Sequence, residues 1–128
     1  MEKKKILAVD DEQDSLEFIK SILEDDTREV ITAHDGNEGI SRAKAESPDI
    51  IILDVQMPHK NGFETFTELK KDSDLRNIPV VMLTGIGEKL GLKFTDEEMK
   101  EYYGEKPEYY LEKPIDPEKL EELVDKLI

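Results

Sequence analysis

Three aspartates in this chain stand directly after short apolar segments, in positions where their carboxylates could bind a metal ion. Asp10 and Asp11 follow residues 5–9, and Asp54 follows residues 50–53. Like charges held close together shift each other's pKa or require a cation. Mg²⁺ fits such a group, because it takes oxygen ligands, keeps several waters and is often completed by phosphate oxygens. The three aspartates are therefore the first candidates for chemistry.

A threonine and a lysine follow two further apolar segments. Thr84 comes directly after residues 79–83, and Lys113 comes shortly after residues 109–111. A single polar residue after a strand is usually a helix cap or part of a turn. Polar groups of these types after four separate apolar segments are much harder to attribute to turn chemistry alone. The combination favours one shared site.

The apolar segments that precede these residues are predicted to be strands of one parallel sheet. The five predicted strands are residues 5–9, 29–33, 50–53, 79–83 and 109–111. Their hydrophobicity is continuous rather than alternating, which indicates burial on both faces between layers of helices. The second strand is the weakest and is expected nearer an edge. Ligands of such sheets bind beyond the carboxyl ends of the strands, where the candidate residues stand.

Helices are predicted between the strands from apolar residues at helical spacing. The predicted helices lie over about 16–23, 37–46, 63–69, 95–104 and 117–127. Thr95 and Glu98 form a capping-box pattern, and Asp116 with Pro117 is typical of a helix start. The expected fold class is α/β: a five-stranded parallel sheet with helices on both faces, doubly wound, with an extended segment between strands four and five.

Length and composition limit the possible functions. The 128 residues predict one domain over residues 1–128. A net charge of −14 argues against direct binding of nucleic acid, which needs clustered lysine and arginine. The chain contains no cysteine, which excludes disulfides, thiolate metal sites and a cysteine nucleophile. No apolar run approaches the ~20 residues of a membrane span, so a cytoplasmic location is expected.

Four motifs carry a resemblance to a known family. The segments ILAVDDE, IILDVQMPHKNG, VVMLTG and YYLEKPI together resemble the CheY-like receiver domain of bacterial two-component response regulators. The separations among Asp11, Asp54 and Thr84 are similar to the family's usual spacing. The resemblance covers nearly the whole chain and implies a flavodoxin-like fold. It implies a phosphoacceptor signalling domain, not an enzyme for an external substrate.

The resemblance also implies a role for each candidate residue. Asp54 accepts a phosphoryl group from a sensor histidine kinase or a histidine phosphotransfer protein. Asp11 and Asp54 bind Mg²⁺ directly, Asp10 acts largely through water, and the backbone carbonyl of Gln56 is a further ligand. Lys113 pairs first with Asp54 and then with a phosphoryl oxygen. An aspartate is a competent nucleophile for this step, which needs mainly positioning and charge neutralisation.

Switching is implied for Thr84 and Tyr110. Thr84 moves toward the phosphoryl group, and Tyr110, three residues before Lys113, rotates into the vacated space. The face formed by the fourth helix, the fifth strand and the last helix then selects partners, and a phosphorylation-dependent dimer is possible. Gln56, two residues after the acceptor, is the expected determinant of the lifetime of the phosphoryl group.

The chain departs from the family between Thr84 and Lys113, where it is several residues longer than receivers usually are. The additional residues lie in 85–108 and form either a partner-specific docking element or neutral surface. Gly85, Gly87 and Gly91 resemble a dinucleotide-binding loop, but the fingerprint requires a glycine where Leu90 stands. Nucleotide binding is therefore not expected.

Other functions remain as alternatives. A hydrolase of the haloacid dehalogenase type also uses an aspartyl phosphate with Mg²⁺, but it needs a second aspartate where Gln56 stands. A receiver-like interaction module without phosphorylation is disfavoured because all of the candidate residues are present. The chain is expected to be either a single-domain regulator or a receiver cut from a larger transcription factor or hybrid kinase. The kinase and the downstream target are not specified by the sequence.

Overall fold

A computed structural model describes residues 3–57, 60–84 and 107–128 of the protein. The predicted helix over residues 95–104, the glycines of the possible nucleotide loop and His59 lie outside the described residues. The carboxylate, threonine and lysine candidates all lie within them.

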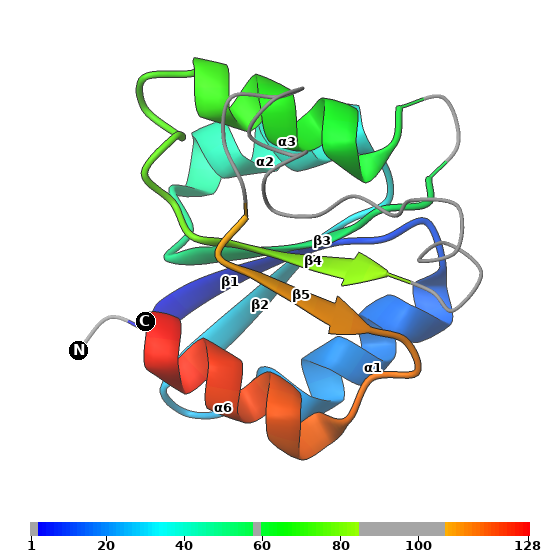
Figure 1. Ribbon diagram of the computed structural model, residues 1–128. Helices are drawn as coiled ribbons and strands as arrows, with labels where there is room; N and C mark the ends of the chain where they lie inside the picture. The colour runs from blue at the N-terminus through cyan, green and yellow to red at the C-terminus, as the bar shows by residue number, and fades with distance from the viewer. Residues whose placement is uncertain (1–2, 58–59, 85–106) are drawn as a thin grey trace.

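The strands form one five-stranded parallel sheet in the order β2-β1-β3-β4-β5 (Figure 1). The strands are β1 (Lys4–Val9), β2 (Arg28–Ala33), β3 (Ile50–Asp54), β4 (Val80–Thr84) and β5 (Tyr109–Glu112). The predicted parallel sheet is confirmed, and β2 lies at an edge as expected. Every residue of the inner strands β3 and β4 is buried, which explains their continuous apolar sequence.

Helices cover both faces of the sheet, so the doubly wound α/β prediction is confirmed. The described helices are α1 (Gln13–Leu23), α2 (Gly36–Glu46), α3 (Gly62–Lys71) and α6 (Pro117–Leu127). In Figure 1, α2 and α3 lie above the sheet, and α1 and α6 lie below it. Each layer has its own hydrophobic core, built from alternate residues of the strands. Side chains such as Ile52, which is fully buried, each stabilise the fold by about 1.5–3 kcal/mol.

Capping residues determine where several helices begin. The side chain of Asp116 accepts hydrogen bonds from the backbone of Glu118 and Lys119 at the start of α6, as predicted. Asn61 and Glu64 form a complete capping box at the start of α3. This box sets the direction in which the chain leaves the loop after β3.

The start of the fourth strand differs from the prediction. Pro79 was expected to open the fourth strand, but β4 begins at Val80. Proline has no backbone N–H to donate to the ladder, although its carbonyl accepts a hydrogen bond of 2.9 Å from Ile51. Asp54 and Thr84 are the last residues of β3 and β4. Both side chains are therefore held by sheet geometry.

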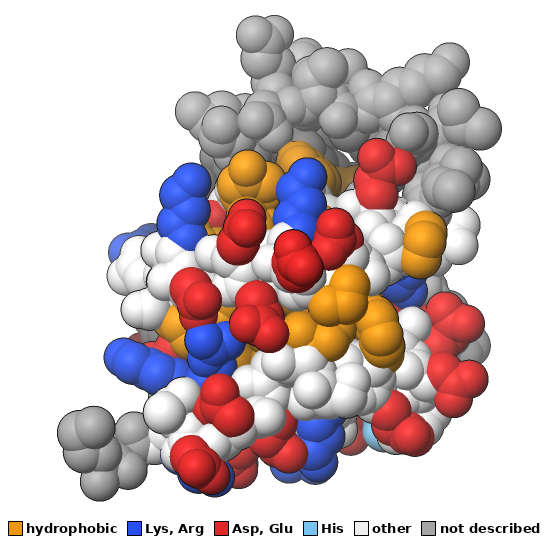
Figure 2. Space-filling view, turned by 90° about the horizontal axis from the view of Figure 1, so that it is seen from below, with side chains coloured by type: hydrophobic (Ala, Val, Ile, Leu, Met, Phe, Trp, Pro, Cys, Tyr) orange, Lys and Arg blue, Asp and Glu red, His pale blue; other side chains and the backbone are white. Residues whose placement is uncertain are grey.

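The surface carries the acidic excess expected from composition. Seen from the side of α1 and α6, acidic side chains are spread over the molecule with fewer basic ones among them (Figure 2). Among the described residues, the structure contains no helix with the length and apolar character of a membrane span.

Candidate functional site

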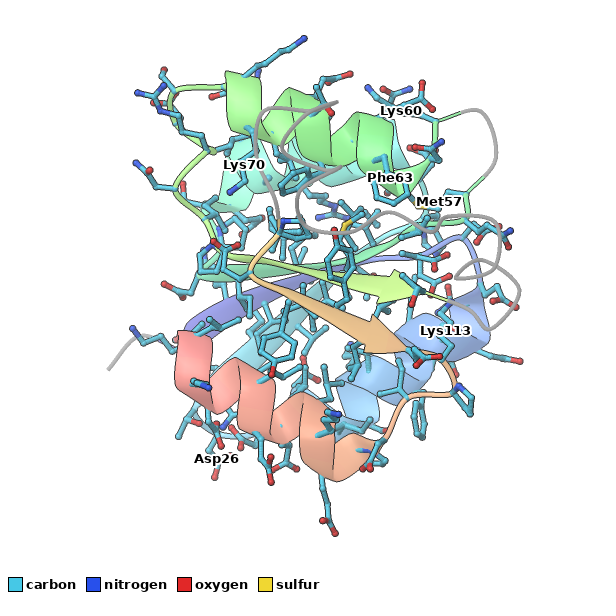
Figure 3. All side chains as sticks on the ribbon, viewed as in Figure 1. Asp26, Met57, Lys60, Phe63, Lys70 and Lys113 are labelled. Atoms are coloured by element: carbon cyan, nitrogen blue, oxygen red, sulfur yellow. The ribbon has the colours of Figure 1, made fainter. Side chains whose placement is uncertain are left out.

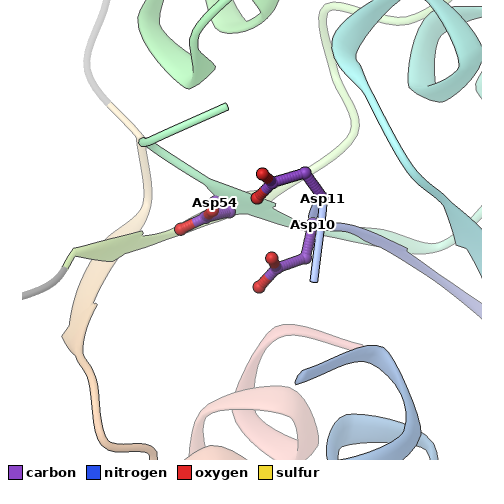
Figure 4. Close-up of side chains that lie close together, drawn as sticks. All are labelled: Asp10, Asp11 and Asp54. Atoms are coloured by element: carbon purple, nitrogen blue, oxygen red, sulfur yellow. The ribbon is translucent and has the colours of Figure 1, made fainter. Parts of the chain in front are cut away.

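Three carboxylates meet at the carboxyl edge of the sheet. Oxygen atoms of Asp10, Asp11 and Asp54 all lie within 4.8 Å of one another (Figure 4). Asp10 and Asp54 are 0% and 2% exposed, whereas Asp11 is exposed. Two buried carboxylates and a third at the surface thus share one small volume.

The pairing of β1 with β3 brings these aspartates together. Val9 and Leu53 are partners in the parallel register, so the residues that follow each of them lie side by side. The backbone N–H of Asp10 donates to the carbonyl of Ala33 at 3.1 Å. Its carboxylate accepts a hydrogen bond of 2.9 Å from the backbone of Glu12. The chain turns out of β1 around the side chain of Asp10 and enters α1.

Lys113 supplies positive charge to this cluster. Its Nζ atom lies 2.9 Å from Asp10, 3.2 Å from Asp54 and 3.7 Å from Glu12, measured to a carboxylate oxygen of each. Figure 3 shows Lys113 just beyond the end of β5, beside the start of α1. Lys113 therefore contacts Asp10 more closely than Asp54.

The neighbouring carboxylates change the acidity of Lys113. Burial alone would lower the pKa of its ammonium group. The hydrogen bond to Asp10 and the negative charges of Asp54 and Asp10 outweigh burial and raise the pKa above the ordinary value of 10.5. Lys113 is consequently a fixed cation at neutral pH.

Thr84 and Tyr110 lie on the same face of the sheet. Thr84 is the last residue of β4 and is 5% exposed, and its carbonyl accepts a hydrogen bond of 2.6 Å from the backbone of Lys113. Tyr110 is the register partner of Met82, which lies two residues before Thr84. Side chains two residues apart on a strand point to the same face. Tyr110 is half-buried against the core on the side of α2 and α3.

The loop after β3 is held close to the acceptor strand by a glycine. The backbone N–H of Gly62 donates to the carbonyl of Val55 at 2.8 Å. A Cβ atom at Gly62 would lie 2.4 Å from the carbonyl oxygen of Asp54 and 2.8 Å from the Cα of Val55. Gln56 is exposed between the buried residues Val55 and Met57. A side chain at position 62 would displace the backbone that carries Asp54 and Gln56.

The donor set at this edge fits a magnesium ion. It consists of hard carboxylate oxygens, close enough together to contact one ion, with three negative charges against one lysine. Mg²⁺ is bound by a few carboxylates with water and phosphate oxygens. The residues present are therefore suitable for the cation that the sequence predicted.

Two charged residues near this edge of the sheet were missed by the sequence prediction, and one of them contacts the site. Glu12 reaches Lys113 at the mouth of the site, and its only sequence signal is its position directly after the acidic pair. Lys60 lies at the same edge of the sheet, beside α3 (Figure 3). It donates to Asn37 at 3.1 Å and forms an ion pair with Glu68. Lys60 therefore ties the loop after β3 to both upper helices rather than entering the site.

Curated proteins similar to this chain include several response regulators. PilH of Pseudomonas aeruginosa is 32% identical over 118 residues, which cover 91% of this chain and 90% of PilH. The alkaline phosphatase synthesis regulatory protein PhoP of Bacillus subtilis is 35% identical over 118 residues, covering 89% of this chain and 44% of PhoP. The chain thus spans about half the length of PhoP, and 48% of a ycf27 regulator of Cyanophora paradoxa.

Solved structures and a family model lead to the same assignment. The chemotaxis response regulator CheY4 of Vibrio cholerae is 30% identical, with a TM-score of 0.82 and coverage of 99% of this chain and 100% of CheY4. The family model for the response regulator receiver domain matches residues 6–125. Domains of this family are signalling modules that bind Mg²⁺ at an acidic pocket and accept phosphate from histidine kinases or phosphotransfer proteins. Together with the acidic site, these matches show that the chain belongs to the response regulator receiver family.

Proposed function

We propose that Asp54 is the phosphoacceptor of this receiver and that residues 1–128 form one such domain. The observation that carries the proposal is a buried carboxylate, at the end of a central strand, that faces both an acidic cluster and a lysine Nζ at 3.2 Å. A carboxylate oxygen of Asp54 attacks the phosphorus of a donor phosphohistidine. The new P–O bond forms as the P–N bond breaks, and the imidazole leaves with the electron pair.

The acidic cluster supports a magnesium-dependent reaction. Asp10, Asp11 and Asp54, with the backbone carbonyl of Gln56, are the residues that would hold Mg²⁺. When bound, the ion neutralises charge on the transferring phosphoryl group. The contribution of the chain is to hold its own ligands rigidly, because Asp54 belongs to β3 and Asp10 anchors the turn after β1. Positioning of this kind accounts for much of the catalysis of phosphoryl transfer.

In this proposal, Lys113 and Thr84 each contact an oxygen of the phosphoryl group. Lys113 exchanges its carboxylate partners for a phosphoryl oxygen, and Thr84 donates its hydroxyl to another. Phosphorylation adds about −1.5 to −2 charge and strong acceptors to the site. The shared face of Thr84 and Tyr110 supports the predicted coupling, in which Tyr110 turns inward as Thr84 moves. The altered surface around β5 and α6 then selects a partner protein.

The remaining roles complete the proposal. Gln56 sets the lifetime of the phosphoryl group, and its exposure beside the acceptor supports this role. The domain assists only its own phosphorylation and dephosphorylation. Its donor is a histidine kinase or phosphotransfer protein in the cytoplasm, and its phosphorylated form dimerises or binds a downstream protein.

Intact-mass spectrometry tests the proposal. The wild-type protein, incubated with acetyl phosphate and Mg²⁺, is expected to gain one phosphoryl group, and Asp54→Ala is expected to gain none. Asp49→Ala is the matched control, because Asp49 is an aspartate at the opposite edge of the sheet that bonds the backbone of Lys5. An adduct on Asp54→Ala, or no adduct on the wild type, would contradict the proposal. A phosphatase assay on the same samples tests the haloacid dehalogenase alternative, which requires turnover.

A further inference from the structure

Glu12 places a negative charge beside the proposed phosphorylation site. It is the N-cap residue of α1, yet within the described residues its side chain makes no capping hydrogen bond. Its backbone N–H is held by Asp10 at 2.9 Å, so the position of the residue is fixed. Its side chain is 68% exposed, and its carboxylate lies 3.7 Å from Nζ of Lys113. Glu12 therefore lies on the solvent-exposed side of the site, next to Lys113.

The negative charge of Glu12 is in excess of what the cations of the site neutralise. The three aspartates carry three negative charges, which Lys113 and a bound divalent cation together neutralise. Among the described residues, Lys113 is the cation within ion-pair distance of Glu12. The Glu12 carboxylate thus competes with the incoming phosphoryl group for Lys113, and it repels any anion that approaches Asp54.

We propose that Glu12 determines which phosphodonors the site accepts, by disfavouring free anionic donors over a phosphohistidine on a protein with a basic contact surface. The inference rests on the proposed acceptor role of Asp54. A small donor such as acetyl phosphate approaches as a dianion and meets the Glu12 charge directly. A protein donor can place a lysine or arginine against Glu12, which removes the repulsion and releases Lys113 to the phosphoryl group.

The size of the effect follows from Coulomb's law. Repulsion between two like charges weakens as the water around them screens it more strongly. Because the Glu12 side chain is 68% exposed, only a modest effect on the rate is expected. Removal of the charge is expected to raise the rate of phosphorylation by acetyl phosphate about three- to tenfold.

Two variants and two donors test the proposal. Glu12→Gln removes the charge and keeps the shape, and Glu17→Gln makes the same change on α1 at a residue that contacts Gln13. The reaction with acetyl phosphate breaks its P–O bond, forms the P–O bond to Asp54, and releases acetate with the electron pair. Phosphoramidate, a monoanion at neutral pH, delivers the same group with less negative charge. Rates are measured by intact mass at saturating Mg²⁺ and at low and high salt.

Glu12→Gln is expected to be phosphorylated faster than the wild type. This increase in rate should be larger with acetyl phosphate than with phosphoramidate, and it should shrink at high salt. Calorimetric titration should show Mg²⁺ affinity unchanged or lower, which excludes tighter metal binding as the cause. Equal rates for Glu12→Gln and Glu17→Gln, or a slower Glu12→Gln, would overturn the inference while leaving Asp54 as the acceptor. If the wild-type protein gains no phosphoryl group from either donor, the proposed function itself fails.

Discussion

Charged residues are arranged differently at the amino ends and at the carboxyl ends of the strands, called here the amino edge and the carboxyl edge of the sheet. At the amino edge, a pocket is lined by charged side chains of both signs and by one serine: Lys3, Lys5, Glu29, Glu46, Asp49 and Ser47. Asp49 accepts a hydrogen bond of 2.8 Å from the backbone of Lys5, and Nζ of Lys5 lies 3.3 Å from the carboxylate of Glu46. At the carboxyl edge, Lys113 is shared by Asp10, Asp54 and Glu12.

This contrast separates charges that support the fold from charges retained for chemistry. At the amino edge, Asp49 and Glu46 are each paired with Lys5, which satisfies these partly buried polar groups. The carboxyl edge crowds carboxylates together and buries two of them, which is unfavourable until a cation enters. Local conflict of this kind is expected at functional sites. The predictions below compare the two edges by changing matched residues at each.

Replacement of Lys113 should have the largest effect on stability. In Lys113→Met, the buried carboxylates of Asp10 and Asp54 lose their lysine. Breaking a buried ion pair costs about 3–5 kcal/mol. Because Lys113 is 21% exposed, solvent screening reduces the expected loss to about 2–3 kcal/mol. Lys5→Met at the amino edge should cost about 0–1 kcal/mol. Urea unfolding in EDTA measures both, and equal losses would show that the two edges do not differ.

The raised pKa of Lys113 predicts a dependence on alkaline pH. A group whose pKa is higher in the folded than in the unfolded state contributes stability that is fully present below the unfolded value. For Lys113, the contribution should persist up to about 10.5 and disappear as pH rises through the higher folded value. The stability difference between wild type and Lys113→Met should therefore shrink above pH 10.5. A difference that stays constant through this range would contradict the assigned cause of the shift.

At the amino edge, Asp49→Ala should destabilise the protein without affecting the site. The substitution leaves the backbone N–H of Lys5 without its carboxylate acceptor. Loss of such a partly buried hydrogen bond costs about 1–2 kcal/mol. Thermal unfolding measures the loss, and calorimetry should show unchanged Mg²⁺ affinity. Weaker Mg²⁺ binding would indicate that the two edges are coupled.

At the carboxyl edge, Asp11→Asn should stabilise the metal-free protein, in contrast to the destabilising change at Asp49. It removes an exposed negative charge beside Asp10 and Asp54, so the metal-free protein should gain about 0.5–1 kcal/mol. The same change removes a proposed ligand, so Mg²⁺ should stabilise this variant less than the wild type. Melting temperatures with EDTA and with Mg²⁺ show both effects. A less stable metal-free variant would mean that Asp11 supports the fold.

The sheet and the acidic edge could be predicted because their signals are local. Continuous apolar segments identify buried strands, and a parallel sheet brings the residues after them to one edge. Exact boundaries depend on ladder hydrogen bonds, so the exclusion of Pro79 from β4 became visible only in the structure. The capping box of Asn61 and Glu64 has a sequence signal that the prediction did not use.

Contacts between loops could not be predicted. The closer approach of Lys113 to Asp10 than to Asp54 depends on the chain path after β5. The approach of Glu12 depends on the turn that Asp10 stabilises. The need for glycine at position 62 follows from its distance to the backbone of Asp54, which no sequence pattern specifies.

Chemical mapping of the acceptor tests the central claim most directly. Borohydride reduces an aspartyl phosphate to homoserine, so the protein is treated with acetyl phosphate and Mg²⁺, reduced, digested and sequenced by mass spectrometry. Homoserine at position 54, dependent on Mg²⁺ and absent from Asp54→Asn, is the predicted result. Homoserine at Asp10, Asp11 or an aspartate of the amino edge would show that the wrong carboxylate has been assigned. A protein without homoserine at any position would contradict phosphorylation on aspartate.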